Sequence, residues 1–215
     1  MRLEEFTKLL TEKQLGELAS LTKPAKIQAF LNSIPYNTED TNFSPLRVIQ
    51  ERKAHCVEGA LFAAAALRFL GYPPIVVDLM PEPGTDDDHV LAIYKSHGGY
   101  GAIAKSNYWC LRYREAVYRN VRELVMSYFQ LYFNVKGIKE LRTYTTPMNL
   151  EAYDHLEWMW SDQGVEKVYG ILLKRRAIPV VTAEMIAELS DLDKLEYEAG
   201  MMGVNPAGLF KPKNV

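Results

Sequence analysis

The chain has 215 residues, a formal net charge of -2 and a hydrophobic fraction of 48%, which suits one folded domain with a sizeable core and gives no basic surplus for binding nucleic acid. Its longest apolar runs fall well short of the roughly 20 residues that a membrane-spanning helix needs, so we expect no membrane partner. Two cysteines and an N-terminus without an apolar signal core indicate a reducing, cytoplasmic setting and no disulfide framework.

Helices are expected before residue 36. Apolar residues recur there at helical spacing in two sets: Leu3, Phe6, Leu9 and Leu10, then Ile27, Phe30, Leu31 and Ile34. Pro24 suits the first turn of the second helix, and Pro35 ends it. A polar loop rich in turn-forming residues follows at 37–44.

The middle of the chain has the pattern of a helix followed by an antiparallel sheet. A helix is predicted from about Cys56 to Gly71, a residue type common just past helix ends. Residues 75–80 are typical of a buried strand. After a loop rich in Pro, Gly and Asp, residues 89–95 and 101–106 have the pattern of a hairpin, which favours antiparallel pairing.

The remainder of the chain is predicted to be mainly helical. One apolar face contains Val117, Val121, Leu124, Val125, Tyr128, Phe129 and Tyr132. Residues 178–181 form a short extended piece, and Thr182 is a suitable N-cap for the helix after it. Cys110 lies in an aromatic stretch, and we expect it to be a small buried residue.

Cys56 stands at the head of its predicted helix, the position of a cysteine nucleophile. An unperturbed thiol has a pKa of about 8.5, and both a helix N-terminus and a neighbouring imidazolium favour the thiolate. The Cys56 backbone N–H would also supply half of an oxyanion hole. The four alanines at 63–66 let a sheet, and a base on that sheet, approach the helix closely. A small buried core residue is the alternative interpretation of Cys56.

His89 is the expected base, because it opens a strand that follows the cysteine helix. We suppose that the hairpin pairs Lys95 with Tyr100. His89 then faces Ser106, and a slip of one residue or a bulge brings Asn107 opposite instead. We predict that Asn107 orients the imidazole, since its side-chain carbonyl can accept from an imidazole N–H, with Ser106 as the alternative. A Cys-His-Asn set is an established variant of the catalytic triad.

Metal binding is the competing use of these residue types. His55, Cys56, His89 and the aspartates 86–88 could each bind zinc, but their spacing fits no tight ligand motif, so we expect no metal and no cofactor. His55 would point away from Cys56 if both residues were helical. The aspartates 86–88 are expected to form a solvated turn, which can also favour cationic ligands.

Three stretches in order, 27–36, 44–46 and 56–74, resemble the transglutaminase-like superfamily, which has papain-like cores. Its members have a helix-borne cysteine, a helix end of the Leu-Arg-x-Leu-Gly type, a strand, and then a strand-borne histidine. The resemblance implies Cys56 as nucleophile and His89 as base. The family's third residue is usually an aspartate, which this sequence lacks at that strand.

These patterns together predict an α+β fold. We expect a papain-like or transglutaminase-like core, in which a cysteine-bearing helix packs on a small antiparallel sheet, with extra helices at both ends. The chain is expected to form a single domain over 1–215. Its core would span 27–107, with a helical extension at 1–26 and a mainly helical extension at 108–215.

The predicted function is that of a cysteine hydrolase acting on an amide or peptide bond in a peptide, a protein or a small amide. Cys56 would attack the carbonyl, His89 would act as base and Asn107 would complete the site. Resolution of the acyl-enzyme by an amine instead of water would make the protein a transglutaminase. The alternative is a noncatalytic binding or scaffold domain that retains the fold.

Overall fold

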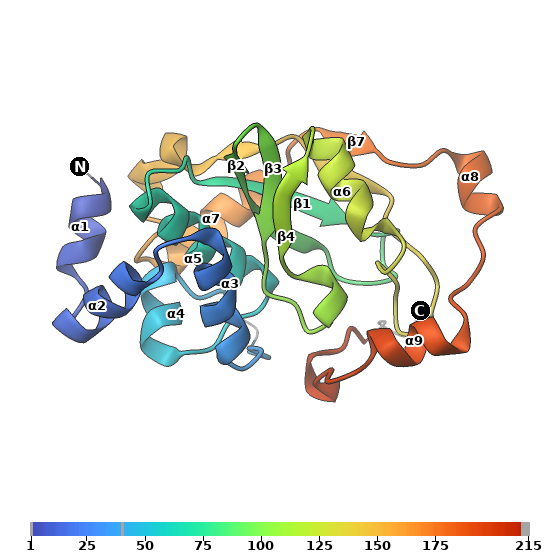
Figure 1. The fold of residues 1–215 in the computed structure, drawn as a ribbon, viewed down its shortest axis with the longest axis horizontal. Coiled ribbons are helices and arrows are strands. Elements are labelled where there is room, and N and C mark those ends of the chain that lie inside the picture. Colours follow the sequence, from blue (N-terminus) through green and yellow to red (C-terminus); the bar gives the residue numbers. More distant parts are fainter. Residues whose placement is uncertain (1, 40, 212–215) are drawn as a thin grey trace.

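An antiparallel sheet organises the fold in the computed structural model, which describes residues 2–39 and 41–211 (Figure 1). The strand order is β4-β3-β2-β1-β5-β7, and β6 also pairs with β1. The strands are β1 (Ile75–Met80), β2 (His89–Ser96), β3 (Gly99–Ile103), β4 (Arg114–Tyr118), β5 (Thr143–Thr145), β6 (Met148–Asn149) and β7 (Ala177–Pro179). β1 and β2 therefore lie in the interior of the sheet.

Helices surround this sheet, with the first four at one end of the molecule and the last two at the other (Figure 1). The α-helices are α1 (Arg2–Lys8), α2 (Glu12–Ser20), α3 (Pro24–Ser33), α4 (Pro45–Glu51), α5 (Cys56–Phe69), α6 (Val121–Phe129), α7 (Asp162–Leu172), α8 (Ala183–Ala187) and α9 (Lys194–Gly200). Short 3-10 helices are η1 (Trp109–Leu111), η2 (Leu150–Leu156) and η3 (Pro206–Gly208). None of the helices in the described ranges has the length and apolar character needed to cross a bilayer.

The cysteine-bearing helix α5 packs directly on β2 and β1, as predicted. Residues 57–67 of this helix are all buried, and its alanines carry too little side chain to hold the strands away. Gly71 follows the helix with a φ of +86°, a conformation that suits glycine after a helix end. The predicted α+β class, with this helix on an antiparallel sheet, is confirmed.

The two faces of the sheet are covered by different helices. Val76, Val90 and Ala92 belong to the core cluster that contains α5. Their sequence neighbours Val77, Leu91 and Ile93 belong to a second cluster with the apolar side chains of α6. This division follows from the alternation of side chains along a strand.

The hairpin has the predicted register, because Lys95 pairs with Tyr100, but it is shorter than predicted. Its last pair is Ala92 with Ile103, and His89 pairs with Leu79 of β1 instead of facing Ser106. This part of the register prediction is therefore wrong.

Contacts with α3 end the hairpin early. The side chain of Gln28 accepts from the Ala104 N–H at 3.1 Å and donates to the Ala104 carbonyl at 2.9 Å, which takes the backbone partners that β2 would have offered. Lys105 then turns inward, and its Nζ donates to the carbonyls of Leu31 and Ile34 at the end of α3, at 2.8 and 2.6 Å. A cation at a helix C-terminus is electrostatically favoured.

The region after residue 107, predicted to be mainly helical, contributes several strands, of which only β7 overlaps the extended piece predicted at 178–181. β4 extends the sheet beside β3, while β5 and β7 extend it beyond β1. Val117, expected on a helical face, lies in β4 with 70% of its surface exposed. The helix begins only at Val121, because the Asn120 side chain caps it by accepting from the Glu123 N–H.

Candidate active site

A cavity of about 320 Å³ opens at the head of α5. Its wall includes the predicted residues Cys56, His89 and Asn107, the alternative Ser106, and the aspartates 86–88. The fold thus brings to one cavity residues that the sequence places in a helix, a strand and the loops beside them. The wall is completed by segments that sequence reasoning left out, among them residues 207–210.

Cys56 is the first residue of α5 and is half-buried. Its Sγ lies 3.7 Å from the Asp88 carbonyl and faces the Val90 N–H, which favours the thiolate, beside the part of β2 that β3 leaves unpaired. Burial raises the pKa of the Cys56 thiol, and the nearby carboxyl groups of Asp88 and Asp78 raise it further. The resting sulfur is therefore a thiol, despite its place at a helix N-terminus.

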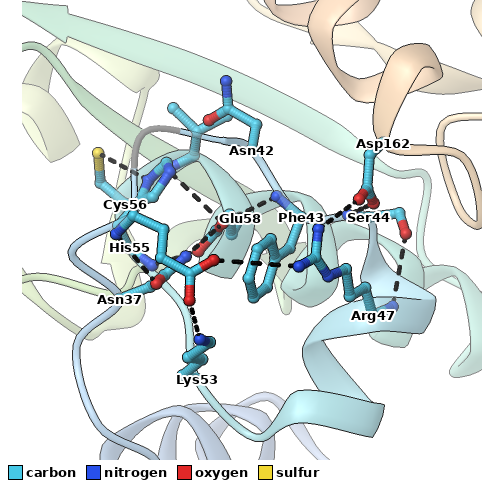
Figure 2. Close-up of polar contacts among 12 residues, drawn as sticks. Asn37, Asn42, Phe43, Ser44, Arg47, Lys53, His55, Cys56, Glu58 and Asp162 are labelled. Carbon is cyan, nitrogen blue, oxygen red and sulfur yellow. Dashed lines mark hydrogen bonds and ion pairs between the residues drawn. The ribbon is translucent and has the colours of Figure 1, made fainter.

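His55 lies against the Cys56 sulfur, contrary to the prediction that it would point away. The distance from Cys56 Sγ to His55 Nδ1 is 3.9 Å (Figure 2). The prediction assumed that both residues are helical, whereas His55 is the N-cap in an extended conformation. The same Nδ1 accepts from the Val57 N–H at 3.3 Å, so its lone pair already caps the helix.

Glu58 is a buried carboxylate that ties the head of α5 to the preceding loop (Figure 2). Its Oε2 accepts from the His55 N–H at 2.7 Å, and its Oε1 accepts from the Asn37 side chain at 2.9 Å and the Phe43 N–H at 2.8 Å. His55 Nε2 lies 3.5 Å from Oε1. Burial raises the pKa of Glu58 to about 7. Sequence reasoning missed this residue, although a glutamate three residues after an N-cap is a capping signal.

His89 is almost fully buried, and its Nε2 lies 2.7 Å from the Leu111 carbonyl. A carbonyl only accepts, so Nε2 carries the proton, and Nδ1 of the neutral ring has the free lone pair. Burial lowers the pKa of His89 to about 4, which keeps the ring neutral near pH 7. By strand alternation the ring leaves β2 on the face of Leu91 and Ile93, opposite the face that α5 covers.

Asn107 holds the C-terminal part of the described chain against the cavity. Its Nδ2 donates to the Asn205 carbonyl at 2.9 Å, and its Oδ1 accepts from the Asn205 N–H at 2.8 Å. Gly208, in the same C-terminal part, lies so close to the Tyr36 ring that an added Cβ would be 2.8 Å from that ring.

The alternative orienter, Ser106, uses its hydroxyl locally, because its Oγ accepts from the Tyr108 N–H. The structure therefore brings Asn107 to the cavity wall, with its amide bound to backbone 98 residues away.

Carboxyl groups crowd the strand side of the sulfur. Asp78 is fully buried on β1, and its carboxyl group contacts that of Asp88. The Asp88 carboxylate also accepts from the Tyr169 hydroxyl at 2.7 Å. Burial raises the pKa of both aspartates. Within the described residues, no group of three or more His, Cys, Asp or Glu side chains is arranged to hold a metal ion.

Comparison with known proteins gives distant structural likenesses. No protein-family model and no curated protein sequence matches the chain. A solved structure of LapG from Legionella pneumophila is similar with a TM-score of 0.36 and 16% identity, covering 48% of this chain and 72% of that one. A structure of the EGTA-treated form of the same protein has the same TM-score and identity and is covered over 69% of its length.

Proposed function

We propose that the protein is a cysteine hydrolase that cleaves an amide or peptide bond, with Cys56 as nucleophile and His89 as base. One observation carries the proposal: the Cys56 sulfur opens on a cavity at a helix head and contacts the β2 backbone on both sides of His89, through the Asp88 carbonyl and the Val90 N–H. The sequence resemblance to transglutaminase-like enzymes assigns the same two roles.

The proposed reaction begins from a neutral thiol and a neutral imidazole. As the sulfur bonds to the substrate carbonyl carbon, the thiol proton passes to His89 Nδ1. The Cys56 backbone N–H, in the first helical turn where N–H groups lack intrahelical acceptors, supports the oxyanion. The C–N bond then breaks, and His89 returns the proton to the leaving amine. Water hydrolyses the thioester and regenerates the thiol.

The Leu111 carbonyl has the orienting role in this proposal. It holds the Nε2–H of His89, as a third triad member does. The role of Asn107 as orienter stays a prediction. Its observed hydrogen bonds with Asn205 give it a positioning role for the cavity wall.

An acyl-trapping experiment tests the proposed function. The protein is mixed with excess p-nitrophenyl acetate, and p-nitrophenol release and the mass of the Cys56 peptide are followed. We expect a burst of about one acetyl group per chain on Cys56. The burst is expected to persist in Cys110→Ala and to be absent in Cys56→Ala.

The pH profile of that burst separates an assisted thiol from an ordinary one. A neutral His89 base works wherever its ring is unprotonated, so the rate should be flat from about pH 5 to 8 and fall as pH drops through about 4. An unassisted thiol would instead gain about tenfold per pH unit until its own pKa. A profile of the second kind would count against the proposal.

A noncatalytic binding domain is the second candidate, and two observations favour it. The raised pKa of Cys56 disfavours a thiolate, and His89 leaves β2 on the face opposite α5. If the protein is such a binding domain, we expect no acetylation burst on Cys56 and no loss of ligand binding in Cys56→Ala.

A further inference from the structure

The charge of the cavity wall is one-sided. Its carboxyl groups are those of Glu39, Asp86, Asp87 and Asp88, and the described lining contains no lysine or arginine. Glu39 is neutralised by Lys53 and Arg47 outside the cavity. Among the described residues, the aspartates 86–88 form no ion pair with any lysine or arginine.

Two buried oxygen atoms beside Asp86 have no hydrogen-bond partner within the described part of the chain. One is the hydroxyl of Tyr108, a cavity-lining residue that is only 9% exposed. The other is Oε1 of Glu140, which is 1% exposed. Leaving such a group unsatisfied costs about 1–3 kcal/mol, so each atom indicates a place where a donor belongs.

The Glu140 carboxylate is held in place while this oxygen stays free. Its Oε2 accepts from the Thr85 hydroxyl at 2.5 Å and the Asn134 side chain at 2.9 Å. Asp86 contacts Glu140, and burial together with this neighbour raises the pKa of Asp86 to about 8. A neighbouring carboxyl group disfavours ionisation. Asp86 is therefore protonated near pH 7 in the empty cavity, and a bound cation would favour its ionised form.

We propose that Asp86 and Tyr108, backed by Glu140, form a subsite for a primary ammonium group of the substrate. An ammonium group offers three N–H donors and a positive charge, which match the Asp86 carboxylate and the spare acceptor capacity of the Tyr108 hydroxyl. The inference rests on the proposed function, since it names the class of amide or peptide that the cavity takes. The ammonium group is bound here and does not react.

Binding to the Cys56→Ala variant tests the subsite without turnover. The probes are N-acetyl-lysine methylamide and its uncharged analogue N-acetyl-norleucine methylamide, measured by isothermal titration calorimetry at pH 8. We expect the lysine probe to bind at least tenfold more tightly. Equal affinities of the two probes would overturn the proposal.

Matched variants in the same background locate the effect. Asp86→Asn should lower the affinity for the lysine probe at least tenfold and leave the affinity for the norleucine probe unchanged. Tyr108→Phe removes only the unsatisfied hydroxyl and should lower the affinity for the lysine probe about threefold. Glu82→Gln is the control, because Glu82 is an acid of the same loop that pairs with Arg142 outside the cavity lining. Similar losses of affinity for the lysine probe in Glu82→Gln and Asp86→Asn would show a long-range charge effect and would contradict the proposed subsite.

The pH dependence gives a second readout that a folding defect would not reproduce. A cation must displace the proton of Asp86, so affinity for the lysine probe should rise about tenfold per pH unit up to about pH 8. Affinity for the norleucine probe should stay flat, and a flat lysine profile contradicts the subsite. If the lysine probe binds as expected but the wild type gives no acetyl burst, the subsite proposal stands and the hydrolase proposal is rejected.

Discussion

The Cys56 sulfur lies between two regions that each supply a neutral histidine, the half-buried His55 at the head of α5 and the buried His89 at the start of β2. On the helix side, His55 Nδ1 is 3.9 Å from the sulfur, but the Val57 N–H already occupies its lone pair. On the strand side, His89 binds the Leu111 carbonyl through Nε2, so its Nδ1 keeps a free lone pair. The His55 ring beside the sulfur thus caps the helix, whereas the His89 ring keeps an unprotonated nitrogen, as the proposed base requires.

In the proposed mechanism, the base is therefore the histidine with the available nitrogen lone pair, and contact with the sulfur is not the criterion. Protonation of His55 would cost the cap on α5 and place a positive charge at a helix N-terminus. Protonation of His89 would leave its bond to Leu111 intact. The two rings also differ in how they are held, since His55 bonds to the Val57 N–H two residues away and His89 bonds to the Leu111 carbonyl 22 residues away.

Removal of the proposed base, His89, is expected to have the largest effect. His89→Gln should slow acetylation of Cys56 by p-nitrophenyl acetate about 10²- to 10⁴-fold, the range that a general base contributes. Circular dichroism and urea unfolding check that the variant is folded. A loss below about threefold in a folded variant would remove His89 from the mechanism.

Substitution of Gly59 tests the close approach between α5 and Lys105, the residue that follows the shortened hairpin. A Cβ added at Gly59 would be 2.2 Å from the Cβ of Lys105, the residue that draws the chain toward α3, so Gly59→Ala should destabilise the fold by about 2 kcal/mol or more. Gly16→Ala is the matched control, because Gly16 is helical with no atom within 4 Å of an added Cβ, and it should stabilise by up to about 1 kcal/mol. Urea denaturation measures both, and equal effects would contradict the close approach.

The buried histidines should make the fold sensitive to acid. Burial lowers the pKa of both His55 and His89 to about 4, from an ordinary value of about 6.5. Their contribution to stability is therefore present above pH 6.5 and is lost as pH falls toward 4. The unfolding free energy of His89→Gln should fall less steeply over this range than that of the wild type. Parallel curves would show that His89 is not buried as a neutral ring.

Substitution of Asn107 is expected to have a moderate effect, on local stability and not on the reaction rate. Asn107→Ala removes both hydrogen bonds to Asn205 and should cost about 1–3 kcal/mol of local stability. Amide hydrogen exchange at residues 203–210 should accelerate, while the acetylation rate at low pH should change less than about threefold. A loss of 100-fold or more, with a shifted pH profile, would instead show that Asn107 orients His89.

The helix-side histidine is expected to have the smallest effect. Asn is a favoured N-cap, so His55→Asn should keep α5 capped and change the acetylation rate less than about threefold. His55→Ala should cost about 1 kcal/mol of stability through the lost cap, again with little change in rate. A larger rate loss than that of His89→Gln would reverse the assignment of the base.

Local pattern predicted much of this fold. The apolar run with Gly71 after it predicted α5, the run at 75–80 predicted β1, and the Lys95–Tyr100 pairing predicted the hairpin register. The strands β4, β5 and β6 were missed, because short strands such as β4 show no period that distinguishes them from part of a helix, whereas the extended piece predicted at 178–181 overlaps β7.

The surroundings of the site followed less directly from pattern. The sequence pointed to Cys56 and His89 but not to Glu58, whose buried role depends on Asn37 and Phe43. The hydrogen-bond partners of His89 and Asn107 depend on where distant backbone comes to lie. Such partners leave no periodic signal in the chain.

The sequence by itself determined that a cysteine begins an alanine-rich helix and that a histidine begins a strand beside it, because helix capping and side-chain periodicity act between near neighbours. Only the tertiary structure decided what surrounds the sulfur. Gln28 ends the hairpin from 76 residues away, and Asn205 occupies the amide of Asn107 from 98 residues away. The aspartates 86–88, expected to form a solvated turn, became part of the cavity wall because the fold partly buries Asp86 and Asp88 against it, while Asp87 stays exposed.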